Sequence, residues 1–296
     1  LAKKGYRVGV HGRSQKRLNN ALARIRKEAA DAELDSFCFD LSLLETQKSF
    51  CAAVLDTYQE TGLHLLFNNA GVFMDSKEIT SDGLEVTFAV NVVAVFTIFS
   101  SLLPLLRKAC NQQMSIEPGS ESIENLQVGV RILNVSSISM HDGPSTLNMK
   151  RIFLSDTPLE NIVDGKKWTS FDSYGISKRF VAMLSLSLSE LLRNEGTRIP
   201  VLTCDPGTVN TKMLLAGWGP CGIDVGDANT QLNIMTEVAF DYENLDGKYW
   251  NGSGSIGKNG IPRRESMHDD AMDKAKRDAL WRWLVNYTGV DPAVNT

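Results

Sequence analysis

The chain has 296 residues, 43% of them hydrophobic and 22% charged, which is the balance of a soluble globular protein. Its net charge is −4 and its pI is about 5.7, so the sequence does not indicate the basic surface that general nucleic-acid binding requires. The histidines, at positions 11, 64, 141 and 268, have no metal-ligand spacing, and we predict no metal site.

The cysteines are scattered, odd in number and without a Cys-x-x-Cys pair, which favours a reducing compartment over a secretory one. Cys38 and Cys204 fall inside apolar, strand-like runs, where buried thiols are expected. We therefore expect a cytoplasmic protein, in which any targeting peptide or membrane anchor would precede Leu1.

Strand-like and helix-like stretches alternate along the chain. Such alternation, with apolar strands, is typical of the α/β class, in which helices cover both faces of a doubly wound parallel sheet. The predicted strands cover residues 6–11, 36–39, 63–67, 130–135 and 199–204, and the predicted helices cover 15–30, 45–61, 81–108 and 174–195.

The stretch 86–106 contains no charged residue and is long enough to cross a membrane. Polar residues such as Asn91 and Thr97 interrupt it, so a buried core helix is the preferred interpretation. Two polar segments, near 110–127 and 141–172, are interpreted as insertions in a single domain that spans 1–296. The second lies beside the candidate catalytic residues, and we expect it to cover the substrate; a passive insertion is the alternative.

The most informative chemistry lies in Tyr174 and Lys178, which are four residues apart. A helix places residues at this spacing on one face, and a nearby cation lowers the pKa of a phenol. Ser137, at the end of a predicted strand, could hydrogen-bond the same substrate oxygen. This set predicts a proton donor for a carbonyl that needs a separate hydride source.

With these motifs in order, the chain resembles the short-chain dehydrogenase/reductase family over almost its whole length, and the resemblance implies a Rossmann-type fold. Asn68-Asn69-Ala70-Gly71 matches the family's turn after its fourth strand, and Ser137, Tyr174 and Lys178 match its catalytic residues. Asp205-Pro206-Gly207, followed by Thr211, matches the segment that borders the nicotinamide. Within the family, Thr80-Ser81-Asp82-Gly83-Leu84-Glu85 is similar to the retinol-dehydrogenase-like branch.

The family's glycine-rich motif, Thr-Gly-x-x-x-Gly-x-Gly, which holds the cofactor pyrophosphate, is not in this sequence. The opening residues 1–5 resemble the end of the helix that follows that motif. We expect a truncated sequence of a normal enzyme that lacks a central strand; the alternative is a variant that binds no cofactor.

The resemblance implies a role for each matching residue. Tyr174 would exchange a proton with the substrate oxygen, Lys178 would hold the ribose, and Ser137 would orient the substrate. Asn91 would hold a water molecule in a proton relay; the alternative is a buried asparagine at a local helix distortion. The remaining cofactor residues would be Arg13, Ser14, Asp40, Leu41, Asn68, Ala70, Gly71, Pro206, Gly207 and Thr211.

Cofactor choice depends on His11-Gly12-Arg13-Ser14, which has no acid to bind a ribose 2′-hydroxyl. Arg13 favours the 2′-phosphate of NADP(H), with NAD(H) as the alternative. We expect a lipophilic carbonyl or alcohol as substrate, in a pocket walled by the second insertion and by 213–224. A homodimer or homotetramer through the helices that begin near Ser81 and Tyr174 is implied by the resemblance. Membrane association is left open.

Two other classes of protein remain open. A catalytically inactive Rossmann scaffold, or a nucleotide sensor, would keep the fold without the reaction. A nucleotide-sugar epimerase also uses Tyr-x-x-x-Lys, but it normally needs more chain after the lysine, and Asn68-Asn69-Ala70-Gly71 argues against it.

Overall fold

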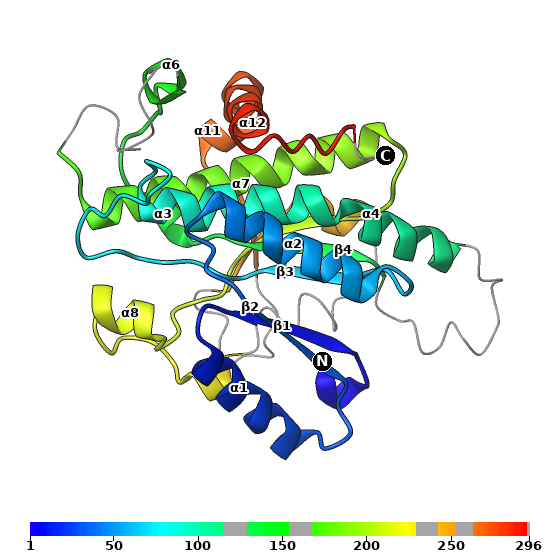
Figure 1. The fold of residues 1–296 in the computed structure, drawn as a ribbon. Coiled ribbons are helices and arrows are strands. Elements are labelled where there is room, and N and C mark those ends of the chain that lie inside the picture. The colour runs from blue at the N-terminus through cyan, green and yellow to red at the C-terminus, as the bar shows by residue number, and fades with distance from the viewer. Residues whose placement is uncertain (115–128, 154–166, 229–241, 253–262, 295–296) are drawn as a thin grey trace.

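The computed structural model describes residues 1–114, 129–153, 167–228, 242–252 and 263–294. Strands and helices alternate as the sequence predicts, and the α/β, Rossmann-like architecture is confirmed (Figure 1). The elements of this alternation are β1 (Val8–Gly12), α1 (Gln15–Glu28), β2 (Leu34–Cys38), α2 (Leu44–Tyr58), β3 (Leu65–Asn68), α4 (Ala94–Met114), β4 (Arg131–Val135), α7 (Ser170–Asn194) and β5 (Val201–Asp205).

The strands form two groups, with the orders β1-β2 and β3-β4-β5-β6-β7. All pairs are parallel except the last, in which β6 (Tyr249–Asn251) is antiparallel to β7 (Arg263–Glu265). The sheet is thus parallel as predicted, apart from this antiparallel pair at its edge. The two strands have three residues each; β6 is buried throughout, whereas β7 at the edge is exposed and charged.

A cavity of about 670 Å³ lies between the two groups, with residues of β1 on one side and of β3 on the other. Apolar side chains from α2 and α4, including Phe50, Val54 and Ile98, also line it. At its start, the chain forms a 3-10 turn, η1 (Ala2–Lys4), which ends at Gly5 with a φ of 80°.

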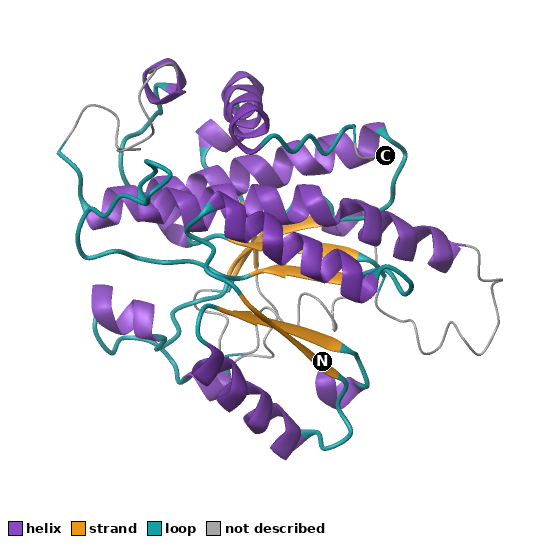
Figure 2. Ribbon diagram, in the orientation of Figure 1, coloured by secondary structure: helices purple, strands orange, loops and turns teal. Residues whose placement is uncertain are grey.

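Helices α2, α4 and α7 cover one face of the strands, and α1 lies on the other side of β1 and β2 (Figure 2). The long helix begins with α3 (Val86–Phe88) and a π-helical segment, η2 (Ala89–Val93), and continues as α4. The span Val86–Gln113 is apolar enough to cross a membrane, but 83% of its most apolar window is buried inside the protein. It packs as the core helix that the sequence favours.

The C-terminal helices α11 (Asp269–Met272) and α12 (Lys274–Thr288) pack over the helix layer (Figure 1). The ring of Trp281 contacts Phe96 and Phe99, and Trp283 contacts Phe88. The two helices expected to form an oligomer are therefore covered by the chain's own C-terminal part. A homodimer or homotetramer stays a prediction.

The described parts of the two insertions do not form a cover over the carboxyl ends of the strands. Residues 110–114 complete α4, and residues 115–127 and 154–166 lie outside the described ranges. The second insertion forms the end of η3 (Ile138–His141) and then α6 (Met149–Phe153), which packs against α12. Three short helices complete the described elements: α8 (Lys212–Gly217), η4 (Val225–Asp227) and α10 (Tyr242–Leu245).

The prediction of a buried thiol is confirmed for Cys204 and wrong for Cys38, which is exposed. Neighbouring residues of a strand point to opposite faces, and Phe37 occupies the buried side of β2. An apolar run therefore predicts a strand here, but it does not predict which face of the strand carries Cys38.

Candidate active site

The carboxyl ends of β3, β4 and β5 open onto a cavity of about 870 Å³. In a parallel sheet these ends share one edge, where ligands bind. The structure brings most of the motifs from Ala70 to Thr211 together here. The residues identified from the sequence that line this cavity are Ala70, Gly71, Ser137, Tyr174, Lys178, Pro206, Gly207 and Thr211.

Helix α7 carries Tyr174 and Lys178 on one face. It begins four residues earlier than predicted because Thr169 caps it, accepting a 3.0 Å hydrogen bond from the main-chain N–H of Asp172. Both side chains are buried, and Lys178 Nζ lies 5.5 Å from the centre of the Tyr174 ring. The spacing of four residues therefore places Tyr174 and Lys178 on one face of the helix, as predicted.

Burial controls the proton affinity of both groups. It raises the pKa of Tyr174 to about 12 and lowers the pKa of Lys178 to about 8. The Ser137 hydroxyl lowers the pKa of Tyr174, whereas Asp205 raises it. Burial thus dominates the pKa of Tyr174 in this structure, and a lowering by the Lys178 ammonium stays a prediction.

Ser137 follows β4 directly and caps η3, where its Oγ accepts a 3.2 Å hydrogen bond from the N–H of Ser139. Ser136 Oγ donates to the main-chain oxygen of Lys178 at 2.8 Å. Asp205, the last residue of β5, accepts a hydrogen bond from the N–H of Ile138. The residues around Ser137 thus join α7 to the ends of two strands.

Asn91 is fully buried in the π-helical segment η2. Its Oδ1 accepts from the N–H of Val72 at 2.8 Å, and its Nδ2 donates to the main-chain oxygen of Val72 at 3.0 Å and to Ser177 Oγ at 2.9 Å. It therefore holds the segment after Gly71 against α7. Its place in a helix distortion agrees with the structural alternative, and the water relay stays a prediction.

The floor of the cavity is built from residues that leave space beside Lys178. A Cβ on Gly71 would lie 3.2 Å from Lys178 Nζ and 3.3 Å from Asn91 Oδ1. Gly207 has a φ of 84°, and Thr211 caps α8 by accepting from the N–H of Leu214 at 3.2 Å. The open floor and the buried ammonium fit the ribose and ring of a nicotinamide cofactor.

The residues expected near the adenine end lie elsewhere, at the carboxyl ends of β1 and β2. Arg13 is exposed, Ser14 precedes α1, and Asp40 accepts a hydrogen bond from the N–H of Ser42 at 2.9 Å. None of these three lines either of the two cavities described. Leu41 and Asn68 line the cavity between the two groups of strands, together with Ala70.

An aromatic cluster that the sequence analysis missed surrounds Tyr174. Phe73 lies 5.6 Å from the Tyr174 ring, measured between ring centres, and 4.8 Å from the ring of Trp218. Phe171 contacts both Phe73 and Trp218. Phe73 follows Asn68-Asn69-Ala70-Gly71 by only two residues, and this proximity to a motif of the site is the feature of the sequence that could have identified it.

The segment 213–224 lines the cavity as predicted, through residues that include Met213, Leu214 and Trp218. Asn210 fixes the C-terminal end of this segment. Its side chain accepts a hydrogen bond from the N–H of Gly222 at 2.8 Å and donates one to the Gly222 carbonyl at 2.7 Å. Among described residues 141–153 and 167–172, none lines this cavity, although Phe171 contacts Trp218 in its wall. The expectation that the second insertion covers the substrate is therefore not met in its described part.

Comparisons of the sequence with known proteins agree with the site described above. The family profile described as short chain dehydrogenase matches residues 1–114. Human polyprenol dehydrogenase is 24% identical over 98% of this chain and 80% of its own length. Mouse retinol dehydrogenase 12 is 24% identical over 98% of this chain and 81% of its own length.

The fold likeness extends to solved structures. An NADPH-bound carbonyl reductase from chicken fatty liver superposes with a TM-score of 0.54, at 20% identity, over 82% of this chain and 84% of its own. The profile, the two relatives and the parallel sheet agree with the motifs. These comparisons support a short-chain dehydrogenase/reductase, and the two relatives that align over nearly the whole chain point to the retinol-dehydrogenase-like branch.

Proposed function

We propose that this protein transfers a hydride between NADP(H) and a lipophilic carbonyl or alcohol. The observation that carries the proposal is the meeting of Ser137, Tyr174 and Lys178 in one cavity at the carboxyl ends of the strands. Besides a hydride source, carbonyl reduction needs a proton donor, here a phenol. It also needs a serine that hydrogen-bonds the substrate oxygen and a buried cation.

Each of these residues takes one part of the reaction. The bound nicotinamide supplies or accepts the hydride. Tyr174 gives its proton to the carbonyl oxygen, or takes it back from the alcohol in the reverse direction. Ser137 orients that oxygen and favours the ionised phenol, and Lys178 holds the ribose. Asn91 keeps the segment after Gly71 in place and would hold the relay water.

The preference for NADP(H) rests on Arg13. It is exposed at the end of β1, in a turn that carries no acid, and a guanidinium pairs well with a 2′-phosphate. Ser14, Asp40 and Leu41 would border the adenine half, and Asn68, Ala70, Pro206, Gly207 and Thr211 the nicotinamide half.

The lipophilic substrate follows from the walls of the cavity. Phe73, Phe171, Trp218 and Leu214 present aromatic and aliphatic surface beside Tyr174, and such walls favour apolar ligands. The names of two relatives, a polyprenol and a retinol dehydrogenase, point to the same class of alcohol. With NADPH in a reducing compartment, the reaction would run toward carbonyl reduction.

The competing function is an inactive scaffold that binds a nucleotide. Exchanging Tyr174 for Phe separates the two, because it removes only the proton donor. We expect NADPH oxidation with retinal or decanal to fall by about 100-fold or more, and the Kd for NADPH to stay within a factor of about two. Turnover is followed by NADPH absorbance, and binding by NADPH fluorescence.

The matched control is Tyr287→Phe. Tyr287 lies on α12, where its ring stacks on Trp283, and it does not line the catalytic cavity. This variant should keep full turnover. If the wild-type protein binds NADPH but turns over none of these substrates, and Tyr174→Phe changes nothing, the scaffold is the better description.

A further inference from the structure

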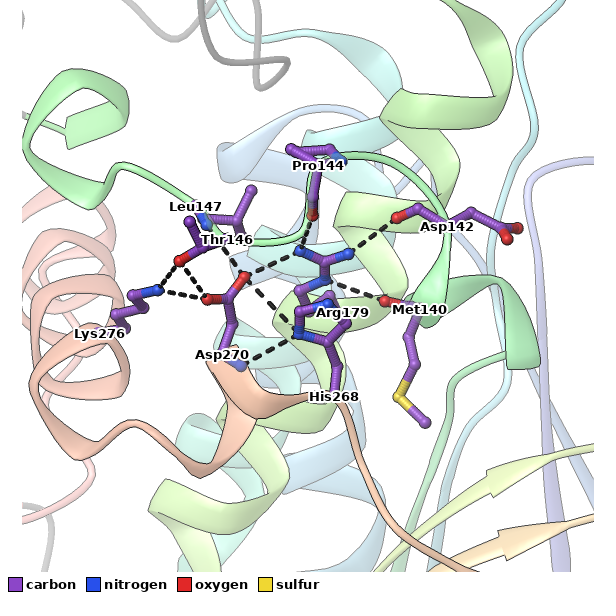
Figure 3. Close-up of polar contacts among 9 residues, drawn as sticks. All are labelled: Met140, Asp142, Pro144, Thr146, Leu147, Arg179, His268, Asp270 and Lys276. Atoms are coloured by element: carbon purple, nitrogen blue, oxygen red, sulfur yellow. Dashed lines mark hydrogen bonds and ion pairs between the residues drawn. The ribbon is translucent and has the colours of Figure 1, made fainter.

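Arg179 follows the candidate catalytic lysine directly and is fully buried. Its guanidinium spans three main-chain oxygens and one carboxylate. Nε donates to Met140 at 2.9 Å, Nη2 to Asp142 at 2.8 Å, and Nη1 to both Pro144 and Asp270 at 2.8 Å (Figure 3). A buried charge is tolerated where its donors are matched by acceptors, as they are here.

The three carbonyls belong to the segment that follows Ser137. This segment forms η3 and then an irregular stretch to Pro144, so its carbonyls need partners from outside. It also lies against α7 directly: a Cβ on Gly175, the residue after Tyr174, would be only 2.7 Å from the oxygen of Ser139. Arg179, one turn further along α7, holds the same segment a second time.

Asp270 connects this contact to the C-terminal part of the chain. It is 2% exposed and accepts from Arg179, from the N–H of Leu147 at 3.0 Å, and from the hydroxyl of Thr146 at 3.1 Å. Lys276, on α12, also bonds it (Figure 3). Burial raises the pKa of Asp270, but the bonds from Lys276 and Arg179 more than offset this, so its pKa lies below its usual value.

From this geometry we propose that Arg179 and Asp270 are positioning residues for Ser137. The ion pair fixes residues 140–147 on α7, and this sets the place of Ser137 relative to Tyr174 on the same helix. The C-terminal segment from His268 to Lys276 thereby becomes part of the support of the active site. The proposal rests on the proposed reductase function, because Ser137 matters only if the reaction occurs.

An ion pair that merely stabilises the fold would lower the melting temperature without changing turnover of the folded protein. A positioning pair must also lower kcat, because a shift of about 1 Å in a catalytic group can cost about 100-fold in rate. The position of the carbonyl-binding serine, and not cofactor affinity, should change. We therefore expect Asp270→Asn to lower kcat by about tenfold or more with the Kd for NADPH unchanged.

The decisive measurement is a double-mutant cycle with Ser137→Ala, carried out below the melting temperature of each variant. If Asp270 acts through Ser137, then Ser137→Ala/Asp270→Asn should be no slower than Ser137→Ala alone. Additive losses would overturn the proposal, because Asp270 would then act independently of the serine. Unchanged kcat in Asp270→Asn would overturn it as well.

Asp246→Asn is the matched control. Asp246 is also buried, also binds an arginine of α7, Arg193, and also accepts from a main-chain N–H, that of Val201. Its partners lie far along α7 from the Ser137 segment, so this variant should lose stability but keep its kcat. An equal loss of kcat in this control would also refute a specific role for Asp270.

Two further variants keep the test decisive if Asp270→Asn does not fold. Arg179→Met/Asp270→Asn removes both partners of the buried ion pair together, and with them the donors that Arg179 gives to the carbonyls of 140, 142 and 144, so it should show the same loss of kcat. Arg179→Lys keeps the charge with fewer donors and should lie between it and the wild type. If Ser137→Ala itself has no effect, the proposed function fails; if Ser137→Ala is slow and these variants are not, only the positioning role fails.

Discussion

Lys178 Nζ donates a 2.9 Å hydrogen bond to the main-chain oxygen of Val135, the last residue of β4. The ammonium is thus tied to the strand that leads into Ser137, and it lies deep in the protein at 3% exposure. A main-chain carbonyl compensates a buried positive charge only partly, and the pKa of Lys178 falls to about 8 because of desolvation.

This pKa predicts how stability depends on pH. The unfolded chain holds the Lys178 proton up to its usual pKa of 10.5, whereas the folded protein releases it from about pH 8. Between these values the unfolded state binds more protons, so the contribution of Lys178 to stability rises with pH. We expect the stability of the wild type, relative to Lys178→Met, to increase from pH 7.5 to pH 10, a range set by the two pKa values.

The comparison is made by urea unfolding of both proteins at each pH. Other groups that titrate in this range are present in both proteins, and their effects cancel. The Tyr174 phenol, whose pKa burial raises from 10.0 to about 12, is also present in both proteins, so its effect cancels too. A difference in stability that stays flat with pH would show that Lys178 keeps its charge in the folded protein.

The contact between Gly175 and Ser139 gives a second prediction. A methyl group on Gly175 would meet a main-chain oxygen at 2.7 Å, which no side-chain rotation can relieve. Gly175→Ala should therefore push the Ser137 segment off α7, at a cost of about 1–3 kcal/mol in the free energy of unfolding. Gly226→Ala is the control, because a Cβ there meets nothing within 4 Å. Equal unfolding curves for Gly175→Ala and the wild type would disprove the close contact.

The sequence predicts the parts of the site that depend on local spacing. The interval from Tyr174 to Lys178 fixes a shared helix face, and the apolar runs before Asn68, Ser136 and Asp205 fix three neighbouring strands. Because parallel strands share one carboxyl edge, the motifs converge without further information. This is why Ser137, Tyr174 and Lys178 lie at one cavity.

The parts that depend on packing between distant segments could not be predicted. Nothing in the sequence near Arg179 indicates that it pairs with Asp270, because the two are joined only when α11 docks on α7. The packing of α12 on α4 through Trp281 likewise joins segments that are far apart in the sequence, so it could not be predicted either. The raised pKa of Tyr174 depends on how deeply the folded chain buries it, and the four-residue spacing to Lys178 gives no information on burial.

Arg13 is expected to decide between the two nicotinamide cofactors. Arg13→Ala removes the cation proposed for the 2′-phosphate, and a charged hydrogen bond of this kind contributes about 1.5–3 kcal/mol. The kcat/KM for NADPH should fall by about tenfold or more, and that for NADH should hardly change. Arg17→Ala, an exposed arginine on α1, is the control. An equal loss with both cofactors would place Arg13 away from the 2′-phosphate.

Trp218 is expected to select lipophilic substrates. It lies 6.1 Å from Tyr174 between ring centres and closes the aromatic cluster with Phe73, while 40% of its surface stays exposed. Trp218→Ala removes apolar surface from the wall, and burial of one large side chain is worth about 1.5–3 kcal/mol. The KM for decanal or retinal should rise by about tenfold or more, whereas kcat/KM for a short aldehyde such as propanal should change little. Met272→Ala removes an exposed side chain on α11 and should alter neither value. A uniform loss across long and short aldehydes would mean that Trp218 supports Tyr174 and does not bind the substrate chain.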